Sequence, residues 1–100
     1  MASRRKTHGT LVVGMGRFGS AVAVTLERLG FEVLAIEKDH QLVQHYSGIL
    51  PLVQGDATDA DALIQVGAKD FASAVVGVGS SLESSVLITA NLVDLGVESI

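Results

Sequence analysis

The sequence contains no cysteine and no tryptophan, and only 4% of its 100 residues are aromatic. Without cysteine the chain has no disulfide framework, no thiolate metal site and no cysteine nucleophile. Polar or charged residues interrupt every apolar run well before the roughly 18 residues that a membrane-spanning helix needs. The stretch 1–8 also lacks the apolar centre of a signal peptide. We therefore expect a cytoplasmic protein that does not insert into a membrane.

Positive charge is also scarce. The formal net charge is −4, and three of the seven basic residues are Arg4, Arg5 and Lys6. The rest of the chain carries four basic and eleven acidic residues, which give it a charge of −7. Such a body repels the phosphate backbone of nucleic acids, so we expect no nucleic-acid partner. The basic stretch 1–8 is expected to be a flexible N-terminal tail.

Aliphatic residues are abundant, since 48% of the chain is hydrophobic, and a chain of this length makes at most one small domain. Apolar periodicity and glycine punctuation predict alternating strands and helices. The strands are expected at 10–13, 31–36, 50–54 and 72–78, and the helices at 17–29, 40–46, 59–66 and 82–95. This alternation predicts an α/β fold, a Rossmann-like doubly wound parallel sheet of order 3-2-1-4.

Two further signals concern the limits of the sheet. Pro51 fits the predicted order, because the third strand would be an edge strand and proline is tolerated there. Residues 97–100 look like the approach to a fifth strand. The domain over 9–100 is therefore expected to be incomplete at its C-terminus, truncated after the fourth βα unit.

A glycine motif lies between the first strand and the first helix. Its sequence is Gly14-Met15-Gly16-Arg17-Phe18-Gly19, which has the spacing G-x-G-x-x-G. In a dinucleotide-binding turn the first glycine allows the sharp turn, the second lets the backbone approach a pyrophosphate, and the third lets the helix pack closely. The helix that follows directs free N–H groups at the phosphate. The motif therefore predicts a phosphate-binding loop.

Acidic and glycine-containing turns follow the next strands. Glu37 lies 18 residues after Gly19, which is the spacing expected for a carboxylate that binds ribose. Lys38 and Asp39 follow it in the turn, and Asp39 is the predicted N-cap of the second helix. Such an acid repels a 2′-phosphate, which favours NAD, ATP or ADP over NADP.

The turns after the third and fourth strands complete the expected site. Gly55, Asp56, Ala57 and Thr58 end the third strand, where a backbone amide can read the adenine edge and Asp56 can fix the loop. Thr58 and Asp61 are expected to form a capping pair for the third helix. Gly77, Val78 and Gly79 end the fourth strand and are expected near the phosphates or the second half of the ligand.

Two features are poorly explained by an isolated folded domain. Arg17 places a cation at a helix N-terminus, against the helix dipole, and a bound phosphate would reverse this unfavourable field. The fourth helix has one apolar stripe and further apolar residues around its circumference, which predicts contact with a second subunit or with the missing C-terminal part. The stripe consists of Leu82, Val86, Ala90 and Val93, and the additional residues are Leu87, Ile88, Leu92 and Leu95.

The sequence offers little for catalysis. His8, His40 and His45 are expected to be ordinary surface residues, no His, Asp and Glu set has metal-ligand spacing, and no G-x-S-x-G motif occurs. We therefore predict no catalytic residue, no metal site and no enzymatic activity. The alternative is the cofactor-binding half of an NAD-dependent oxidoreductase, whose catalytic residues would lie beyond residue 100.

Taken together, the GRFG segment (16–19), the 37–39 turn, the GDAT segment (55–58) and the end of the fourth strand resemble the N-terminal lobe of RCK/KTN domains. More narrowly, the chain resembles the regulatory subunit of bacterial Ktr/Trk-type potassium uptake systems. The resemblance covers residues 9–100. It implies a cytoplasmic protein at the inner face of the membrane that forms dimers and often octameric rings. It also implies that the protein docks on a membrane potassium-translocating subunit. Binding of ATP, ADP, NAD or NADH would then gate potassium transport.

The resemblance also implies roles for individual residues. The three motif glycines would hold the phosphates, and Glu37 would hold the ribose. Arg17 would contact a terminal phosphate, either in its own subunit or across the dimer. Asp39 and the 56–58 turn would lie near ribose and adenine. The sequence departs from the family pattern in two ways. It stops before a later acidic residue that helps hold a divalent cation in some members, and it stops before a separate C-terminal lobe.

Overall fold

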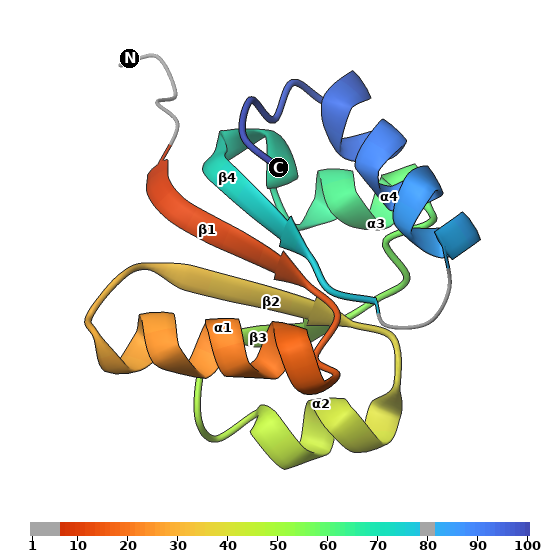
Figure 1. Cartoon of the computed structure of the whole chain (residues 1–100). Coiled ribbons are helices and arrows are strands. Elements are labelled where there is room, and N and C mark those ends of the chain that lie inside the picture. The colour runs from red at the N-terminus through yellow and green to blue at the C-terminus, as the bar shows by residue number, and fades with distance from the viewer. Residues whose placement is uncertain (1–6, 79–81) are drawn as a thin grey trace.

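A single parallel sheet lies between two layers of helices (Figure 1). The computed structural model describes residues 7–78 and 82–100. The sheet order is β3-β2-β1-β4, which confirms the predicted order 3-2-1-4. The strands are β1 (Thr7–Val13), β2 (Val33–Glu37), β3 (Leu52–Gln54) and β4 (Phe71–Val76). The helices are α1 (Arg17–Arg28), α2 (His40–Tyr46), α3 (Ala60–Gln65), the 3₁₀ turn η1 (Ala68–Asp70) and α4 (Leu82–Asp94).

The central strand β1 supplies side chains to both faces of the sheet. Leu11 and Val13 belong to one buried cluster, which contains residues of α3 and α4, whereas Val12 belongs to a second cluster with residues of α1. This alternation follows from the two-residue period of a strand. Figure 1 accordingly shows α1 and α2 on one face and α3 and α4 on the other. The carboxyl ends of all four strands point the same way.

The strand boundaries differ from the predicted ones for identifiable reasons. β1 begins at Thr7, so it includes two residues that the sequence assigned to the tail, through a pairing of Thr7 with Phe71. β3 begins only after Pro51, which has no N–H to donate, although its carbonyl still accepts a hydrogen bond from Ala35 N at 3.1 Å. The edge position that the proline predicted is confirmed.

Both short helices begin at aspartate N-caps. Asp39 accepts a hydrogen bond from Gln41 N at 2.9 Å, which confirms its predicted capping role. The third helix is capped differently from the prediction. Asp59 caps α3 by accepting from the N–H of Asp61, and Thr58 bonds to the preceding turn instead of pairing with Asp61.

The segment after α4 returns to the sheet. Ser99 forms a parallel bridge with Ser73 of β4, and its carbonyl accepts a hydrogen bond from Ala74 N at 2.8 Å. This contact agrees with the expectation that residues 97–100 approach a fifth strand.

The fourth helix divides its apolar residues between the core and the surface. The prediction that Ile88 and Leu92 contact a second subunit or a C-terminal part is wrong, because both are buried against the sheet. Leu82, Val86 and Val93 are 78%, 59% and 59% exposed, and Ala90 is also exposed. These four exposed residues are called the α4 apolar face below. Among the described residues, no helix has both the length and the apolarity that crossing a membrane requires.

Candidate functional site

The glycine loop joins β1 to α1 at the carboxyl edge of the sheet. Gly14 has φ +96°, and a Cβ on it would lie 2.6 Å from the carbonyl oxygen of Gly77. A Cβ on Gly19 would lie 1.7 Å from the carbonyl oxygen of Gly14. Side chains are therefore excluded at both positions by backbone atoms. These contacts let the start of α1 lie directly against the strand ends.

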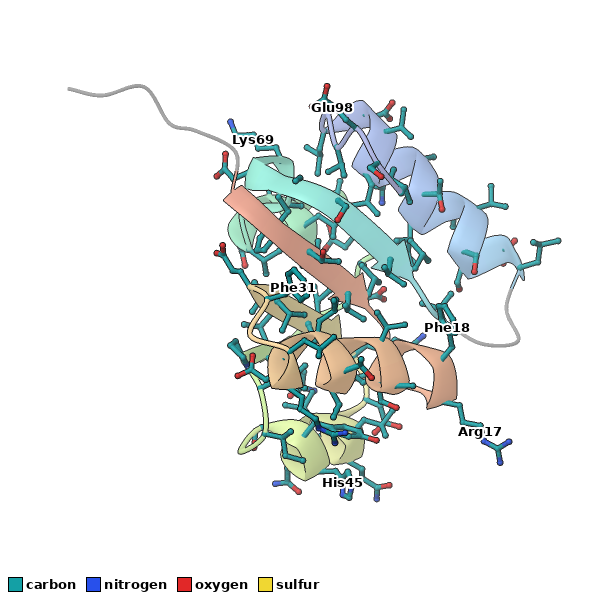
Figure 2. All side chains as sticks on the ribbon, turned by 60° about the vertical axis from the view of Figure 1, so that its left-hand side comes forward. Arg17, Phe18, Phe31, His45, Lys69 and Glu98 are labelled. Atoms are coloured by element: carbon teal, nitrogen blue, oxygen red, sulfur yellow. The ribbon has the colours of Figure 1, made fainter. Side chains whose placement is uncertain are left out.

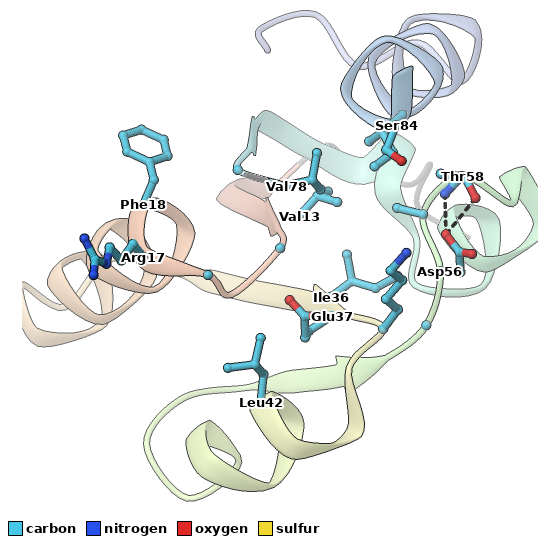
Figure 3. Close-up of a pocket in the computed structure, with 17 residues that line it drawn as sticks. Val13, Arg17, Phe18, Ile36, Glu37, Leu42, Asp56, Thr58, Val78 and Ser84 are labelled. Carbon is cyan, nitrogen blue, oxygen red and sulfur yellow. Dashed lines mark hydrogen bonds between the residues drawn. The ribbon is translucent and has the colours of Figure 1, made fainter. Parts of the chain in front are cut away.

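The N-terminus of α1 is open to a ligand. Its N-cap is Gly16, which supplies no side-chain cap, and the first turn carries no acidic residue. The first-turn N–H groups and the positive end of the helix dipole are therefore not neutralised by a side chain. Figures 2 and 3 show Arg17 and Phe18 projecting from this first turn, with Arg17 extending away from the body of the protein.

Glu37 links the glycine loop to the second helix. It is only 8% exposed, yet its Oε1 accepts a hydrogen bond from Met15 N at 2.6 Å and its Oε2 accepts one from Asp39 N at 2.8 Å. Two backbone donors thus stabilise a carboxylate at the end of β2. The sequence predicted a ligand-binding acid here but missed this second role in holding the loop. The side chain of Met15 is buried in the core, so only its backbone reaches the site.

The turn after β3 is closed by its own side chains. Asp56 Oδ1 accepts hydrogen bonds from the hydroxyl of Thr58 at 2.7 Å and from Thr58 N at 3.0 Å (Figure 3). These two hydrogen bonds hold the pKa of Asp56 below its ordinary value, and the bond from the Thr58 hydroxyl makes the larger contribution. A small loss of solvation at this exposed carboxyl group opposes the shift, and the positive charge of Lys38 supports it. The expectation that Asp56 fixes this loop is therefore confirmed.

One contact to this turn was not predicted from the sequence. Asn91 of α4 donates through Nδ2 to the carbonyl oxygens of Ala57 and Thr58, at 3.3 and 3.1 Å. The available signal was a carboxamide directly before the buried Leu92 in an otherwise apolar stretch of helix. A polar group in such a position usually has a hydrogen-bond partner.

These segments surround a cavity of about 380 Å³ at the carboxyl ends of the strands (Figure 3). Twelve predicted site residues line it: Gly14, Gly16, Arg17, Phe18, Glu37, Lys38, Gly55, Asp56, Ala57, Thr58, Gly77 and Val78. Of the other predicted residues, Met15, Gly19 and Asp39 do not line the cavity, and Gly79 lies outside the described residues. The sequence did not single out five further lining residues, which are Val13, Ile36, Leu42, Ser84 and Ile88.

The cavity has the character of a binding site. Its volume lies within the range of small-molecule pockets, and aliphatic side chains such as Ile36, Leu42 and Val78 alternate with a few polar groups. His40 and His45 are exposed on α2 and do not line it. Within the described ranges, no group of three His, Asp or Glu residues is arranged to hold a metal ion.

Residues 10–99 match the sequence model of the TrkA-N domain. The chain belongs to the TrkA-N domain family. This confirms the resemblance that the glycine loop and the three later turns indicated. Among curated proteins, this TrkA-N chain is 37% identical over 90 residues to potassium uptake protein C of the Ktr system of Bacillus subtilis (strain 168). It is 32% identical over 98 residues to protein A of the same system.

The matches cover most of this chain but less than half of each relative. They include 89% of this chain and 41% of Ktr protein C, and 97% of this chain and 44% of Ktr protein A. Among solved structures, the TrkA-N chain is similar to the NAD(P)-binding domain of an exopolyphosphatase-related protein from Archaeoglobus fulgidus. The TM-score is 0.82 at 20% identity, over 93% of this chain and 71% of that one. Isoflavone reductase matches with a TM-score of 0.71 at 19% identity, over 90% of this chain and 33% of that one. These two likenesses confirm the Rossmann-like fold.

Proposed function

We propose that the cavity binds an adenine nucleotide, either NAD/NADH or ATP/ADP. The observation that carries this proposal is the convergence of four separate chain segments, all predicted to contact the ligand, on one cavity of about 380 Å³. The glycine loop and the uncapped start of α1 would bind the phosphates. Glu37 would bind the ribose, and the 55–58 turn would face the adenine. Gly77 and Val78 would lie near the phosphates or the second half of the ligand.

The proposed ribose contact agrees with the hydrogen bonds that Glu37 already makes. Each carboxylate oxygen has two acceptor sites, and each accepts one backbone N–H hydrogen bond, Oε1 from Met15 and Oε2 from Asp39. The remaining acceptor sites suit the two hydroxyls of a ribose. A 2′-phosphate in the same place would meet a negative charge, so the proposed preference is for NAD, ATP or ADP over NADP.

Arg17 would give nucleotides with different numbers of phosphates different affinities for the site. Arg17 is among the residues that line the cavity, and its side chain extends outward from the first turn of α1 (Figure 2). There it can reach a terminal phosphate on its own copy or on a neighbouring one. A contact to the γ-phosphate would favour ATP over ADP and would give the two ligands different effects on assembly.

We further propose that the protein is a non-catalytic regulatory subunit that acts in the cytoplasm, at the inner face of the membrane, on a potassium-translocating partner. The Ktr relatives, both named as potassium uptake proteins, support this assignment over the oxidoreductase alternative. In this mechanism the nucleotide changes the shape of a homo-oligomer, a dimer or a ring of dimers such as an octamer, and so gates transport. A ligand can bias that equilibrium only through its different affinities for the two shapes.

The α4 apolar face is the surface proposed for self-association. Leu82, Val86 and Val93 together expose large aliphatic side chains on one side of a single helix. Between them Ser85, Val86, Thr89 and Ala90 line a shallow depression. Small side chains beside larger ones permit the close approach of a second helix. A second copy of this chain would therefore cover the face in the assembled protein.

The decisive experiment is thermal unfolding of the chain with ATP, ADP, NAD, NADH and NADP. A ligand present at 100 times its dissociation constant should stabilise the fold by about 2.7 kcal/mol. Stabilisation by ATP and ADP as well as NAD, with a much weaker effect of NADP, is the expected result. A response to NAD and NADH alone would favour the oxidoreductase alternative. The absence of any response would contradict the proposed nucleotide site.

A second measurement addresses the proposed partner. Potassium uptake would be followed in cells that contain the full-length protein and its potassium-translocating subunit. Replacing Gly16 with alanine, which places a methyl group at the proposed phosphate position, should abolish the nucleotide dependence of uptake. Uptake that responds to nucleotide equally with and without Gly16 would contradict regulation through this cavity.

A further inference from the structure

Asn91 joins α4 to the turn that follows β3. It is the only asparagine in the chain, and its Nδ2 donates to the carbonyl oxygens of Ala57 at 3.3 Å and Thr58 at 3.1 Å. Both partners are acceptors that cannot donate, so the amide nitrogen and not the amide oxygen must face the turn. One side chain thus connects segments more than thirty residues apart in the sequence.

The peptide unit between Ala57 and Thr58 is held from both sides. Its carbonyl accepts from Asn91, and its N–H donates to Asp56 Oδ1 at 3.0 Å. Because a peptide unit is planar, hydrogen bonds on opposite sides fix its orientation. Gly55 N adds a third restraint by donating to the carbonyl of Glu37 at 3.0 Å. The turn is therefore held before any ligand arrives by hydrogen bonds to α4 and to β2 and by the side chain of its own Asp56.

This positioning determines which backbone donors remain. Within the described residues, the N–H groups of Asp56 and Ala57 have no hydrogen-bond partner, and both residues line the cavity. At the Watson–Crick edge of the base, an N–H donor matches N1 of adenine, which is an acceptor, and opposes N1 of guanine, which carries a hydrogen. A site that offers a fixed donor rejects a base that cannot accept from it.

We propose that Asn91 is the positioning residue for base recognition. It does not line the cavity, and it acts by fixing the 56–58 backbone against which the base lies. The proposal rests on the proposed adenine-nucleotide site and assigns the residue that determines its selectivity for adenine over guanine.

The test compares the binding of ADP and GDP to the wild-type chain and to Asn91→Leu by isothermal titration calorimetry. Leucine removes both donors and retains high helix propensity. We expect ADP affinity to fall about tenfold and GDP affinity less than about twofold, because only the adenine contact depends on the fixed turn. Asn91→Gln keeps the carboxamide and should recover part of the ADP affinity. The matched control is Gln65→Leu, an exposed amide on α3 that should leave both affinities unchanged.

The outcomes distinguish the two proposals. If the wild-type chain binds neither nucleotide, the nucleotide site itself fails. If it binds ADP and Asn91→Leu retains the same ADP-to-GDP preference, the role of Asn91 alone is overturned, and equal losses for both nucleotides would overturn it as well. If leucine prevents folding, Asn91→Ser replaces it, since serine keeps one short donor that cannot span both carbonyls. The same fall in the ADP-to-GDP ratio is then expected, and an unchanged ratio overturns the role.

Discussion

Alanine substitutions at Gly16 and Gly19 should have different effects, although both residues belong to one motif. The first should weaken ligand binding, and the second should destabilise the fold. A Cβ on Gly16 would meet no heavy atom within 4 Å, whereas a Cβ on Gly19 would lie 1.7 Å from the carbonyl oxygen of Gly14. Gly16 lines the cavity with φ −69°, a value that any residue adopts, and Gly19 is buried under the loop. The same added methyl group therefore has opposite consequences at the two positions.

The magnitudes follow from these distances. In Gly19→Ala the methyl group must move by roughly 1.5 Å or more to reach van der Waals distance, and the obstacle is backbone. Overpacking of this kind costs about 1–3 kcal/mol, which lowers Tm by about 4–8 °C per kcal/mol in a domain of this size. Gly16→Ala weakens only the helix cap, at a cost of less than about 1 kcal/mol. Its methyl group nevertheless occupies the proposed approach of the phosphate, so ADP affinity should fall at least about tenfold.

The assay pairs thermal unfolding with calorimetric titration of ADP for both variants. Gly16→Ala should unfold near the wild-type temperature and bind poorly, and Gly19→Ala should unfold at a markedly lower temperature. Wild-type ADP affinity in Gly16→Ala would refute the placement of the phosphates on this loop. A wild-type Tm in Gly19→Ala would refute the close packing of α1 on the loop.

Three further predictions concern other elements. In Glu37→Gln the amide NH₂ group cannot accept, so one of the two backbone donors, such as the N–H of Asp39, loses its partner in a buried place. The free energy of unfolding, measured with denaturant, should fall by about 1–3 kcal/mol. Because the pKa of Asp56 is lowered by folding, its contribution to stability is present above about pH 4, its unfolded value, and is lost as pH falls through the lowered pKa. The stability difference between wild type and Asp56→Asn should therefore shrink under acid, and a difference independent of pH would contradict this account. Val86→Glu places a charge on the α4 apolar face and should reduce self-association in analytical ultracentrifugation. The control Ala21→Glu, at an exposed position on α1, should leave self-association unchanged.

The element order and sheet topology could be predicted because local signals agreed with one another. Asp39 marked the start of a helix, and Pro51 marked an edge strand, and both signals act over a few residues. The errors fall where tertiary contacts decide. The start of β1 at Thr7 depends on pairing with β4, and the cap of α3 depends on whether the Asp61 N–H donates to Asp59 or to Thr58.

The candidate site was predictable to a similar extent and for a similar reason. Residues on the strand ends were found because parallel strands bring their carboxyl ends to one edge. Contacts from the following helix were missed, since nothing in the spacing of Ser84, Ile88 and Asn91 indicates how α4 crosses that edge. The hydrogen bond from Met15 N to Glu37 was likewise not predicted, because it depends on the exact approach of two loops.

The bonds of Glu37 suggest why its carboxylate can serve both the fold and the ligand. A buried carboxylate without donors would be costly, but two backbone N–H groups already stabilise its charge. A ribose would then add hydrogen bonds to an acceptor that is already oriented, so little reorganisation would accompany binding. The same arrangement connects the glycine loop, the end of β2 and the start of α2 through one side chain. Strain introduced at any of these three segments should therefore alter ligand affinity together with stability, whereas Gly16→Ala, whose added methyl group meets no protein atom, should alter affinity far more than stability.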